Sequence, residues 1–349
     1  MSVLQALPQV DGPAEAGSPG VGEVRVAGRR LVPTAVFDTY WRFAALRQQV
    51  FQARVAGAAR PWTDDPILAQ HRFTNCFRAA DRVSQYLIRE VSYGGDQRWE
   101  EVFFRTLLFK LFNKVSTWEL LRAELGCEPS WAGYDFARYD KILSRAFGAG
   151  TRLYSAAYIT PPPLLGEKRK HANHLRLLEL MMADGAPARV LSAPGLEQAY
   201  QVLLGYPALG PFLAYQFVID LNYAAAMPFD EQDFVVPGPG ARDGIRKCFG
   251  PAATGIETEV IHYMARTQEE HFKRLGLEPV RLAGRRSLQL IDCQNLFCEV
   301  DKYARVAHPQ VEGISGRSRI KQVYRQDPAP ITPWFPPKWG LEQAELASR

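Results

Sequence analysis

Several absences narrow the class of this protein before any motif is considered. The five cysteines, at positions 76, 127, 248, 293 and 298, form no CxxC pair and no His-paired spacing, which argues against a disulfide framework and a zinc site. No apolar run approaches the roughly 20 residues of a membrane span, and no secretory signal is present. Rossmann and P-loop glycine patterns are missing too. We therefore expect a cytoplasmic protein without metal, cofactor or membrane partner.

Alternating apolar and polar residues are also scarce, which disfavours an extensive sheet. Of the 349 residues, 47% are hydrophobic and 11% aromatic, so the chain can bury a large core. Apolar residues recur mainly at helical spacing, and no internal repeat is present. The sequence predicts an all-α fold, either a single large multi-helix domain or two lobes.

Composition divides the chain into three parts. Residues 1–30 are rich in Pro, Gly, Ala and Val without periodicity, which is typical of a disordered or loosely attached tail. Residues 31–325 carry the helical patterns and are expected to form the catalytic domain. Residues 326–349 contain five prolines together with Trp334, Phe335 and Trp339. We expect this last part to be an extended tail that lies across the helical body.

Local signals place several helix starts. Asp38 is expected to cap a helix that runs to about Ala58. A second helix is expected from residues 73–75 to about residue 91. Ser116 with Glu119 matches a capping box, which predicts a helix beginning there.

Two polar pairs have ordinary explanations. Asp64 and Asp65 lie in a turn between prolines, where capping of the next helix is more probable than a metal or sugar contact. His171 and His174 are three residues apart on a helix, but no third ligand is nearby. We expect a solvated histidine pair.

The stretch around which the chain is organised is residues 210–249. It begins as an apolar helix in which Gln216 and Asp220, four residues apart, share one face. A carboxylate in such surroundings is costly unless it is paired or used. The helix is followed by Val-Pro-Gly-Pro-Gly at 236–240, either a sharp turn or a phosphate-holding hairpin at Gly238 and Gly240. Arg242 follows in the next helix.

Other polar residues stand within apolar helices or at their ends. On the last long helix, Asn295, Glu299 and Lys302 form a stripe at i, i+4 and i+7. This stripe is either a solvent face with an ordinary Glu-Lys pair or a site. Asn113 and Lys114 stand at a helix-helix corner, which is either solvated or part of a pocket.

A cationic segment lies near the end of the helical region. The net charge of +5 permits a polyanionic partner without requiring one. Residues 315–325 read SGRSRIKQVYR, and their basic side chains would suit a phosphate backbone. Arg317, Arg319 and Lys321 are therefore candidate DNA contacts.

The hairpin is similar to that of helix-hairpin-helix DNA glycosylases. In that group an aliphatic-Pro-Gly-x-Gly hairpin precedes a helix ending in Phe-Gly and an aliphatic-Asp-Thr step that carries the catalytic acid. Here Phe249 and Gly250 are followed by Ile256-Glu257-Thr258. The resemblance makes Glu257 an alternative catalytic acid, with Glu in place of Asp.

A wider resemblance covers about residues 37–325. The chain contains, in order, FDTYWRF, PWTDDPIL, FTNCFRAADR, LFNKVSTW, GPFLAYQFVIDLN, VPGPGARDGI and NLFCEVDKY. This series resembles the alpha-glutamyl/putrescinyl-thymine pyrophosphorylase group, also described as the helical domain of hydroxymethyluracil DNA kinases. The resemblance implies action on DNA carrying modified pyrimidines.

Within that group, some members resemble enzymes of phage thymine hypermodification. Others resemble bacterial glycosylases that defend against phage by removing glucosylated hydroxymethylcytosine. Because no kinase or other modification domain is fused to this sequence, we expect the defence glycosylase.

Hydrolysis of the base from deoxyribose passes through an oxocarbenium-like sugar, and it needs a carboxylate and an extruded nucleotide. The hypothesis assigns the carboxylate to Asp220 or Glu299, with Glu257 as the alternative. Lys302 or Lys114 could add strand cleavage through a Schiff base. Candidate contacts to the base or its sugar are Asn75, Asn113, Lys114, Gln216, Asn222 and Asn295.

Two further functions use the same residues. One is a transferase that displaces pyrophosphate from an activated hydroxymethyluracil and installs an amine. The other is a non-catalytic reader of modified DNA.

Overall fold

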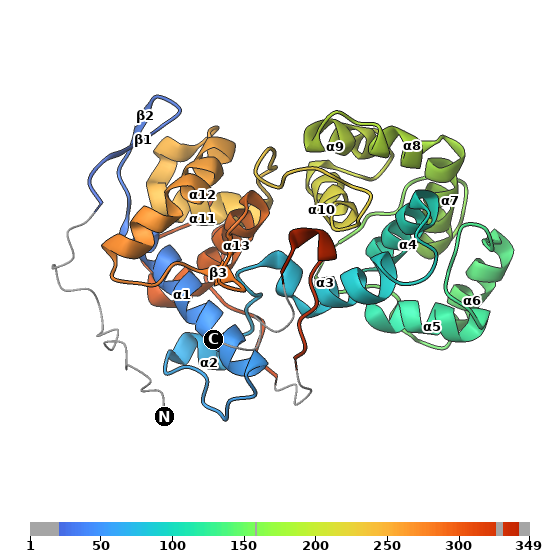
Figure 1. Cartoon of the computed structure of the whole chain (residues 1–349), viewed down its shortest axis with the longest axis horizontal. Coiled ribbons are helices and arrows are strands. Elements are labelled where there is room, and N and C mark those ends of the chain that lie inside the picture. The colour runs from blue at the N-terminus through green and yellow to red at the C-terminus, as the bar shows by residue number, and fades with distance from the viewer. Residues whose placement is uncertain (1–20, 158, 326–330, 342–349) are drawn as a thin grey trace.

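The computed structural model describes residues 21–157, 159–325 and 331–341, and helices dominate these residues (Figure 1). The all-α prediction is confirmed. The α-helices are α1 (Ala35–Val55), α2 (Pro66–Gln70), α3 (Arg82–Tyr86), α4 (Trp99–Phe112), α5 (Val115–Leu125), α6 (Phe136–Gly148), α7 (Lys170–Ala183), α8 (Ala186–Leu191), α9 (Leu196–Leu204), α10 (Pro211–Leu221), α11 (Pro239–Phe249), α12 (Glu257–Arg274) and α13 (Leu290–Ala307).

Short elements complete the fold. One antiparallel hairpin pairs β1 (Val24–Val26) with β2 (Arg29–Leu31), and another pairs β3 (Arg281–Leu282) with β4 (Arg286–Ser287). Single helical turns occur at η1 (Arg78–Ala80), η2 (Leu87–Ser92), η3 (Gly250–Ala253) and η4 (Pro337–Trp339).

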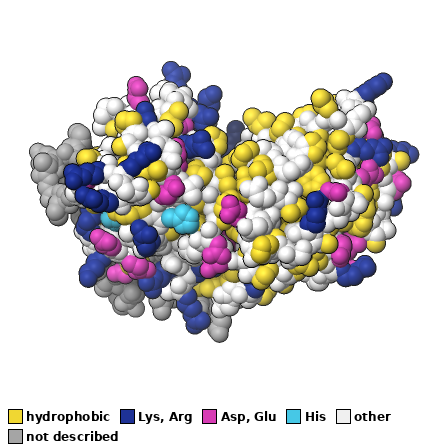
Figure 2. Space-filling model, turned by 90° about the horizontal axis from the view of Figure 1, so that it is seen from above, with side chains coloured by type: hydrophobic (Ala, Val, Ile, Leu, Met, Phe, Trp, Pro, Cys, Tyr) yellow, Lys and Arg dark blue, Asp and Glu magenta, His cyan; other side chains and the backbone are white. Residues whose placement is uncertain are grey.

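The helices form two groups side by side (Figure 1). The first contains α1, α2 and α11–α13, and the second contains α4–α10, with α3 between them. Buried side chains from both groups nevertheless belong to one hydrophobic core. Seen from above, hydrophobic side chains are most frequent over the second group (Figure 2).

Helices α11 and α13 make the closest contact in the first group, and glycines permit it. A Cβ atom at Gly244 would lie 2.1 Å from the carbonyl oxygen of Phe297. A Cβ atom at Gly240 would lie 3.0 Å from the Sγ of Cys298. These glycines are therefore required for packing, whatever else the hairpin does.

Two predicted helix starts are wrong. The cap of α1 is Thr34, whose hydroxyl accepts a hydrogen bond from the backbone of Val36. Asp38 lies inside the helix and forms an ion pair with Arg274 instead. Helix α5 begins at Val115, so Ser116 is a helical residue and not a cap.

The single helix expected over 73–91 is also wrong. Residues 73–77 are irregular and η1 is a single turn, and beyond Asp81 the chain is continuously helical, with α3 leading directly into the π-helical turn η2. Asp81 separates η1 from α3 with an extended backbone, ψ 144°. This broken segment positions the polar side chains described below.

Parts of both expected tails are ordered against the helices. The hairpin β1–β2 spans residues 24–31, across the end of the expected N-terminal tail, and buries Val24, Val26 and Leu31, while residues 1–20 lie outside the described residues. Near the other end, the backbone N–H of Trp334 donates to Gln85 and the Trp334 ring contacts Tyr93. Residues 331–341 thus lie across the helical body, while 326–330 and 342–349 are outside the described residues.

Substitution of Gly244 by alanine is expected to lower the free energy of unfolding by at least about 2 kcal/mol, because the new methyl group meets backbone that must move. Gly148 ends α6 and has open space at its Cβ position, so G148A is the matched control. It should leave stability unchanged or raise it by up to about 1 kcal/mol. Denaturant unfolding of both variants measures the difference, and equal stabilities would contradict the packing role.

Candidate functional site

A fully buried ionic network joins the second group of helices to the segment between the groups. The carboxylate of Asp220 on α10 is 1% exposed and accepts hydrogen bonds of 2.7 and 2.9 Å from the guanidinium of Arg78. Lys110 on α4 lies 2.9 Å from the same carboxylate. Burial opposes ionisation of Asp220, but the two cations outweigh it and hold its pKa below the usual value.

Arg78 is the centre of this network. Its Nε donates to the side chain of Gln216 at 3.0 Å, and one Nη donates to the hydroxyl of Tyr223 at 3.0 Å. Its backbone N–H donates to Asp292 on α13 at 2.8 Å. Gln216 and Asp220 therefore share one face, as predicted, and that face binds an arginine which the sequence did not single out.

Three other predicted residues lie at helix ends around this network. Asn113 ends α4 in a left-handed conformation, φ 49°, and its side chain accepts from Lys110 at 3.2 Å. Asn222 ends α10 and donates to the carbonyl of Phe229 at 3.0 Å. Lys114 donates to the carbonyl of Arg152. Asn113 thus joins the network, whereas Lys114 points to the 149–169 loop.

A second polar cluster lies on α13 and is partly open to solvent. Glu299 and Lys302 form an ion pair of 2.6 Å, with side chains 12% and 13% exposed. The same oxygen of Glu299 accepts from the backbone N–H of Thr74 at 3.0 Å. Within the described part of the chain the other carboxylate oxygen, Oε1, makes no hydrogen bond. We call residues 73–75 the catalytic-loop candidate.

Asp81 is a member of this cluster that sequence reasoning missed. Its carboxylate accepts from the backbone N–H of Asn75 at 2.8 Å. Burial raises the pKa of Asp81 to about 6, against the lowering effect of the Asn75 N–H, and the charge of Glu299 raises it further. The consecutive backbone N–H groups of Thr74 and Asn75 thus donate to two carboxylates, those of Glu299 and Asp81. The sequence shows this aspartate in the motif FTNCFRAADR, but the prediction of one continuous helix there gave it no role.

The same cluster contains buried polar atoms without partners. Arg47 donates to the carbonyl of Thr74 at 2.9 Å through Nε. Its Nη1, the hydroxyl of Thr74 and the Oδ1 of Asn75 have no hydrogen-bond partner. Such atoms are uncommon in folded proteins, and they recur at functional sites.

The glycine hairpin lies beside this cluster. Gly240 contacts Cys298, the residue before Glu299, and a Cβ at Gly238 would be 3.6 Å from Gln294. No side chain caps the N-terminus of α11, and Arg242 in its first turn is exposed. Asn295 is half-buried one helical turn before Glu299. The structure therefore brings together Asn75, Glu299 and Lys302, with Asn295 on the same face of α13 and Gly240 packed against the neighbouring Cys298.

Glu257 is placed elsewhere. It is the first residue of α12, and its carboxylate accepts a hydrogen bond of 3.0 Å from the backbone N–H of Gly255 in the preceding turn. The adjoining turn is held by Arg29 of the β1–β2 hairpin, which donates to Ala252 and Thr254. In the described residues Glu257 forms no ion pair with either cluster.

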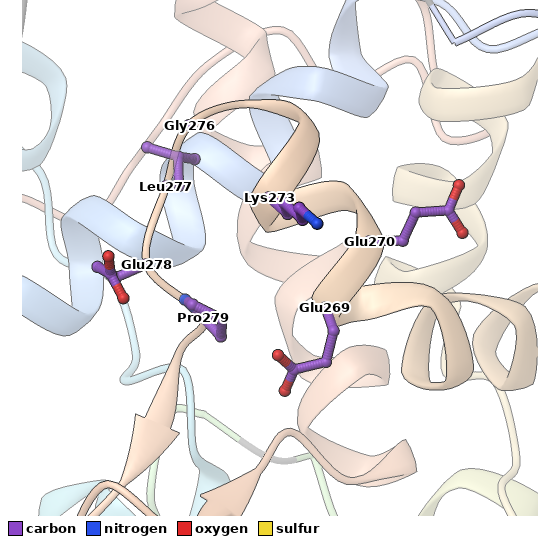
Figure 3. Close-up of a pocket in the computed structure, with 7 residues that line it drawn as sticks. All are labelled: Glu269, Glu270, Lys273, Gly276, Leu277, Glu278 and Pro279. Atoms are coloured by element: carbon purple, nitrogen blue, oxygen red, sulfur yellow. The ribbon is translucent and has the colours of Figure 1, made fainter.

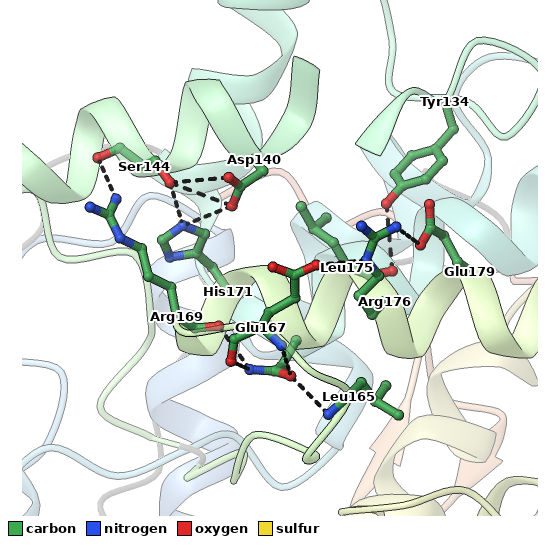
Figure 4. A network of polar contacts seen from close by, with 11 residues as sticks. Tyr134, Asp140, Ser144, Leu165, Glu167, Arg169, His171, Leu175, Arg176 and Glu179 are labelled. Carbon is green, nitrogen blue, oxygen red and sulfur yellow. Dashed lines mark hydrogen bonds and ion pairs between the residues drawn. The ribbon is translucent and has the colours of Figure 1, made fainter. Parts of the chain in front are cut away.

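The histidine pair is buried, so the prediction of a solvated pair is wrong. His171 is 3.0 Å from the hydroxyl of Ser144 and 3.3 Å from Asp140, in a network between α6 and α7 (Figure 4). His174 contacts the hydroxyl of Tyr154 at 2.8 Å, and burial lowers its pKa to about 4. Among the described residues, no three His, Cys, Asp or Glu side chains are grouped to hold a metal ion.

Two minor features have simple explanations. Asp65 caps α2 through a 2.7 Å hydrogen bond from Leu68, as the turn predicted. A surface recess of about 540 Å³ at the end of α12 is lined by Glu269, Glu270, Lys273, Gly276, Leu277, Glu278 and Pro279 (Figure 3). Its acidic lining does not suit a phosphate.

Comparison with known proteins decides the family. The family described as "5-hmdU DNA kinase, helical domain" matches residues 34–313. The chain belongs to this family. The 5-hmdU DNA kinase of Bacillus phage SP10 is 24% identical to it over 287 residues, which is 77% of this chain and 45% of the phage protein. The chain thus spans about half the length of that relative.

No solved structure matches the chain. The region shared with the 5-hmdU DNA kinase helical-domain family contains both polar clusters and ends before the cationic segment 315–325. No helix among the described residues is long and apolar enough to cross a membrane.

Substitution of Arg78 by methionine is expected to lower the free energy of unfolding by about 3–5 kcal/mol, because it leaves the Asp220 carboxylate buried without its main partner. The matched control is Glu269→Gln, which breaks a largely exposed ion pair with Arg281. That variant should change stability by no more than about 1 kcal/mol. Thermal or denaturant unfolding compares them, and a small effect of R78M would show that the network is dispensable.

Proposed function

We propose that this chain is a DNA glycosylase that hydrolyses the N-glycosidic bond of a modified pyrimidine and leaves an abasic site. The preferred substrate is glucosylated hydroxymethylcytosine in phage DNA, in a defence role. Membership of the family favours DNA with modified pyrimidines. The observation that carries the reaction type is the pair of carboxylates, Glu299 and Asp81, held by successive amides of one loop.

Glu299 is the better of the two original carboxylate candidates. Asp220 accepts three charged hydrogen bonds and is inaccessible, so it has no free oxygen for a sugar cation or a water. Glu299 keeps Oε1 unpaired and is partly exposed. An accessible carboxylate can stabilise the oxocarbenium-like sugar and orient water.

Asp81 and Lys302 have supporting roles in this reaction. Asp81, with its pKa raised to about 6, is suited to give a proton to the departing pyrimidine. The Lys302 ammonium pairs with Glu299 and lies 4.6 Å from the centre of the Phe73 ring. A lysine held in this way is a poor nucleophile, which favours hydrolysis without strand cleavage.

Substrate contacts are assigned to the residues around the carboxylates. The unpaired amide oxygen of Asn75 and the half-buried Asn295 flank Glu299 and would bind the extruded base or its sugar. The bare N-terminus of α11 at Gly238 and Gly240, with Arg242, would hold a flanking phosphate.

The test is incubation of the purified chain with phage DNA that carries glucosylated hydroxymethylcytosine, and with unmodified DNA. Abasic sites and released base are measured, the latter by mass spectrometry. Release of the glucosylated base from modified DNA alone is the expected result. Dependence of product formation on an added amine would point to the transferase, and binding without any product would point to a reader.

Glu299→Gln should reduce base release by at least about 100-fold with little change in folding or DNA binding. Asn295→Ala should reduce it less, through weaker substrate binding. Asp220→Asn is the contrasting variant, since its main effect should be on the melting temperature. Retention of full activity in the folded E299Q protein would overturn the assignment.

Base release under single-turnover conditions should fall as pH rises through about 6, because only protonated Asp81 can donate to the base. Asp81→Asn should lower the rate at pH 5 and remove this decline. A rate that increases through pH 6 in the unsubstituted protein would show that Asp81 acts instead as a base.

A further inference from the structure

The cationic segment 315–325 is fixed to the helical body at three places. The backbone N–H of Ser315 donates to Asp243 of α11 at 2.7 Å. Farther on, Arg305 of α13 donates to the carbonyl of Arg319 at 3.1 Å. Finally, residues 322–324 pair antiparallel with residues 70–72, through Arg72 N–H to Gln322 at 3.0 Å and Tyr324 N–H to Gln70 at 2.9 Å.

Two side chains anchor the second half of this segment to the helical body. Ile320 is half-buried and packs against the core. Tyr324 is also half-buried, with the guanidinium of Arg60 5.4 Å from its ring centre. The cationic side chains of the segment are all exposed, namely Arg317, Arg319, Lys321 and Arg325.

Four exposed cations thus lie within nine consecutive residues of a segment that is fixed to the body, and we call them the cationic row. No carboxylate forms an ion pair with them in the described part of the chain. Such a row suits the regularly repeated charges of a nucleic-acid backbone.

The row ends beside residues 73–75, the catalytic-loop candidate. Residues 70–72, which pair with it, lead directly into Phe73, Thr74 and Asn75. Arg72 is exposed and extends the row toward that loop. At the other end, Ser315, two residues before the row, is bound by Asp243 of α11, whose N-terminus is the candidate phosphate site.

We propose that residues 317–325, the phosphate rail, bind the sugar-phosphate backbone of one strand of the substrate DNA, beside the target nucleotide. The choice of DNA as the partner rests on the proposed function. The rail lies beyond the family match at residues 34–313. Because the backbone contact is to a single strand, an unpaired oligonucleotide is sufficient to occupy it.

The test is the salt dependence of DNA binding by the triple variant Arg317→Gln, Arg319→Gln and Lys321→Gln. Binding of a fluorescein-labelled oligonucleotide, as a single strand and as a duplex, is measured by anisotropy. Each lost phosphate contact should reduce the slope of log K against log salt by about 0.7 to 0.9. For three contacts, affinity near 0.1 M salt should fall by on the order of 100-fold.

The control carries the same loss of charge on the other group of helices. Lys141, Arg152 and Lys168 are exposed there, and their joint replacement by Gln should change the slope and the affinity far less. Equal losses in the two triple variants would mean that only net charge matters and would overturn the rail. A loss seen with duplex but not with single-stranded DNA would overturn its single-strand form.

The test of the phosphate rail can be distinguished from the test of the glycosylase reaction. If the unsubstituted protein releases no base but the rail variant still loses affinity and slope, the rail stands and the reaction does not. If base release is observed and the rail variant keeps its KM and its salt slope, the reaction stands and the rail is wrong.

Discussion

The structure depends on the burial of one arginine. Arg78 lies between the two groups of helices, with its guanidinium against Asp220, Gln216 and Tyr223 of the second group. Its backbone N–H is bound by Asp292 of the first group. Isolated charges at this depth would be prohibitively unfavourable, so the arginine, the aspartate and Lys110 must be buried together. The relative position of α4, α10 and α13 is thereby constrained.

The burial of Arg78 also constrains the positions of Asp81 and Glu299, the two carboxylates of the proposed reaction. Arg78 and Asp81 belong to one short segment, and Asn75 donates to its C-terminal end, at the Asp81 carboxylate and the carbonyl of Ala80. A shift of Arg78 would therefore move Asp81, and with it the loop whose Thr74 N–H holds Glu299. The buried network is closed to solvent, but it positions the carboxylates of the proposed active site.

The sequence predicted the features that depend on local spacing. The shared face of Gln216 and Asp220 follows from helix geometry alone, as does the stripe of Asn295, Glu299 and Lys302. The partner of Asp220 is 142 residues away, and no periodicity identifies it. The first part of the predicted helix over 73–91 is wrong for a related reason, since a local hydrogen bond from Asn75 to Asp81 and a tertiary one from Arg78 to Asp292 outweigh the helical preference of residues 73–81.

Burial was the other quantity that the sequence misjudged. The His171 and His174 pair reads as solvated, yet both rings are enclosed because Ser144, Asp140 and Tyr154 supply hydrogen bonds from distant segments. For the 236–240 stretch the sequence predicts either a sharp turn or a phosphate-holding hairpin. The structure adds a packing reason for the glycine at 240, since a Cβ atom there would lie 3.0 Å from the Sγ of Cys298.

Accessibility separates the two acidic candidates in a way that residue type cannot. Asp220 has its negative charge satisfied by two cations, which gives stability to the joint between helices but removes its capacity to respond to a new positive charge. Glu299 has one cation and one amide on a single oxygen, and it leaves the other oxygen unpaired. A sugar cation that develops beside Glu299 would find an acceptor already in place, and this preorganisation is the main contribution that such sites make to catalysis.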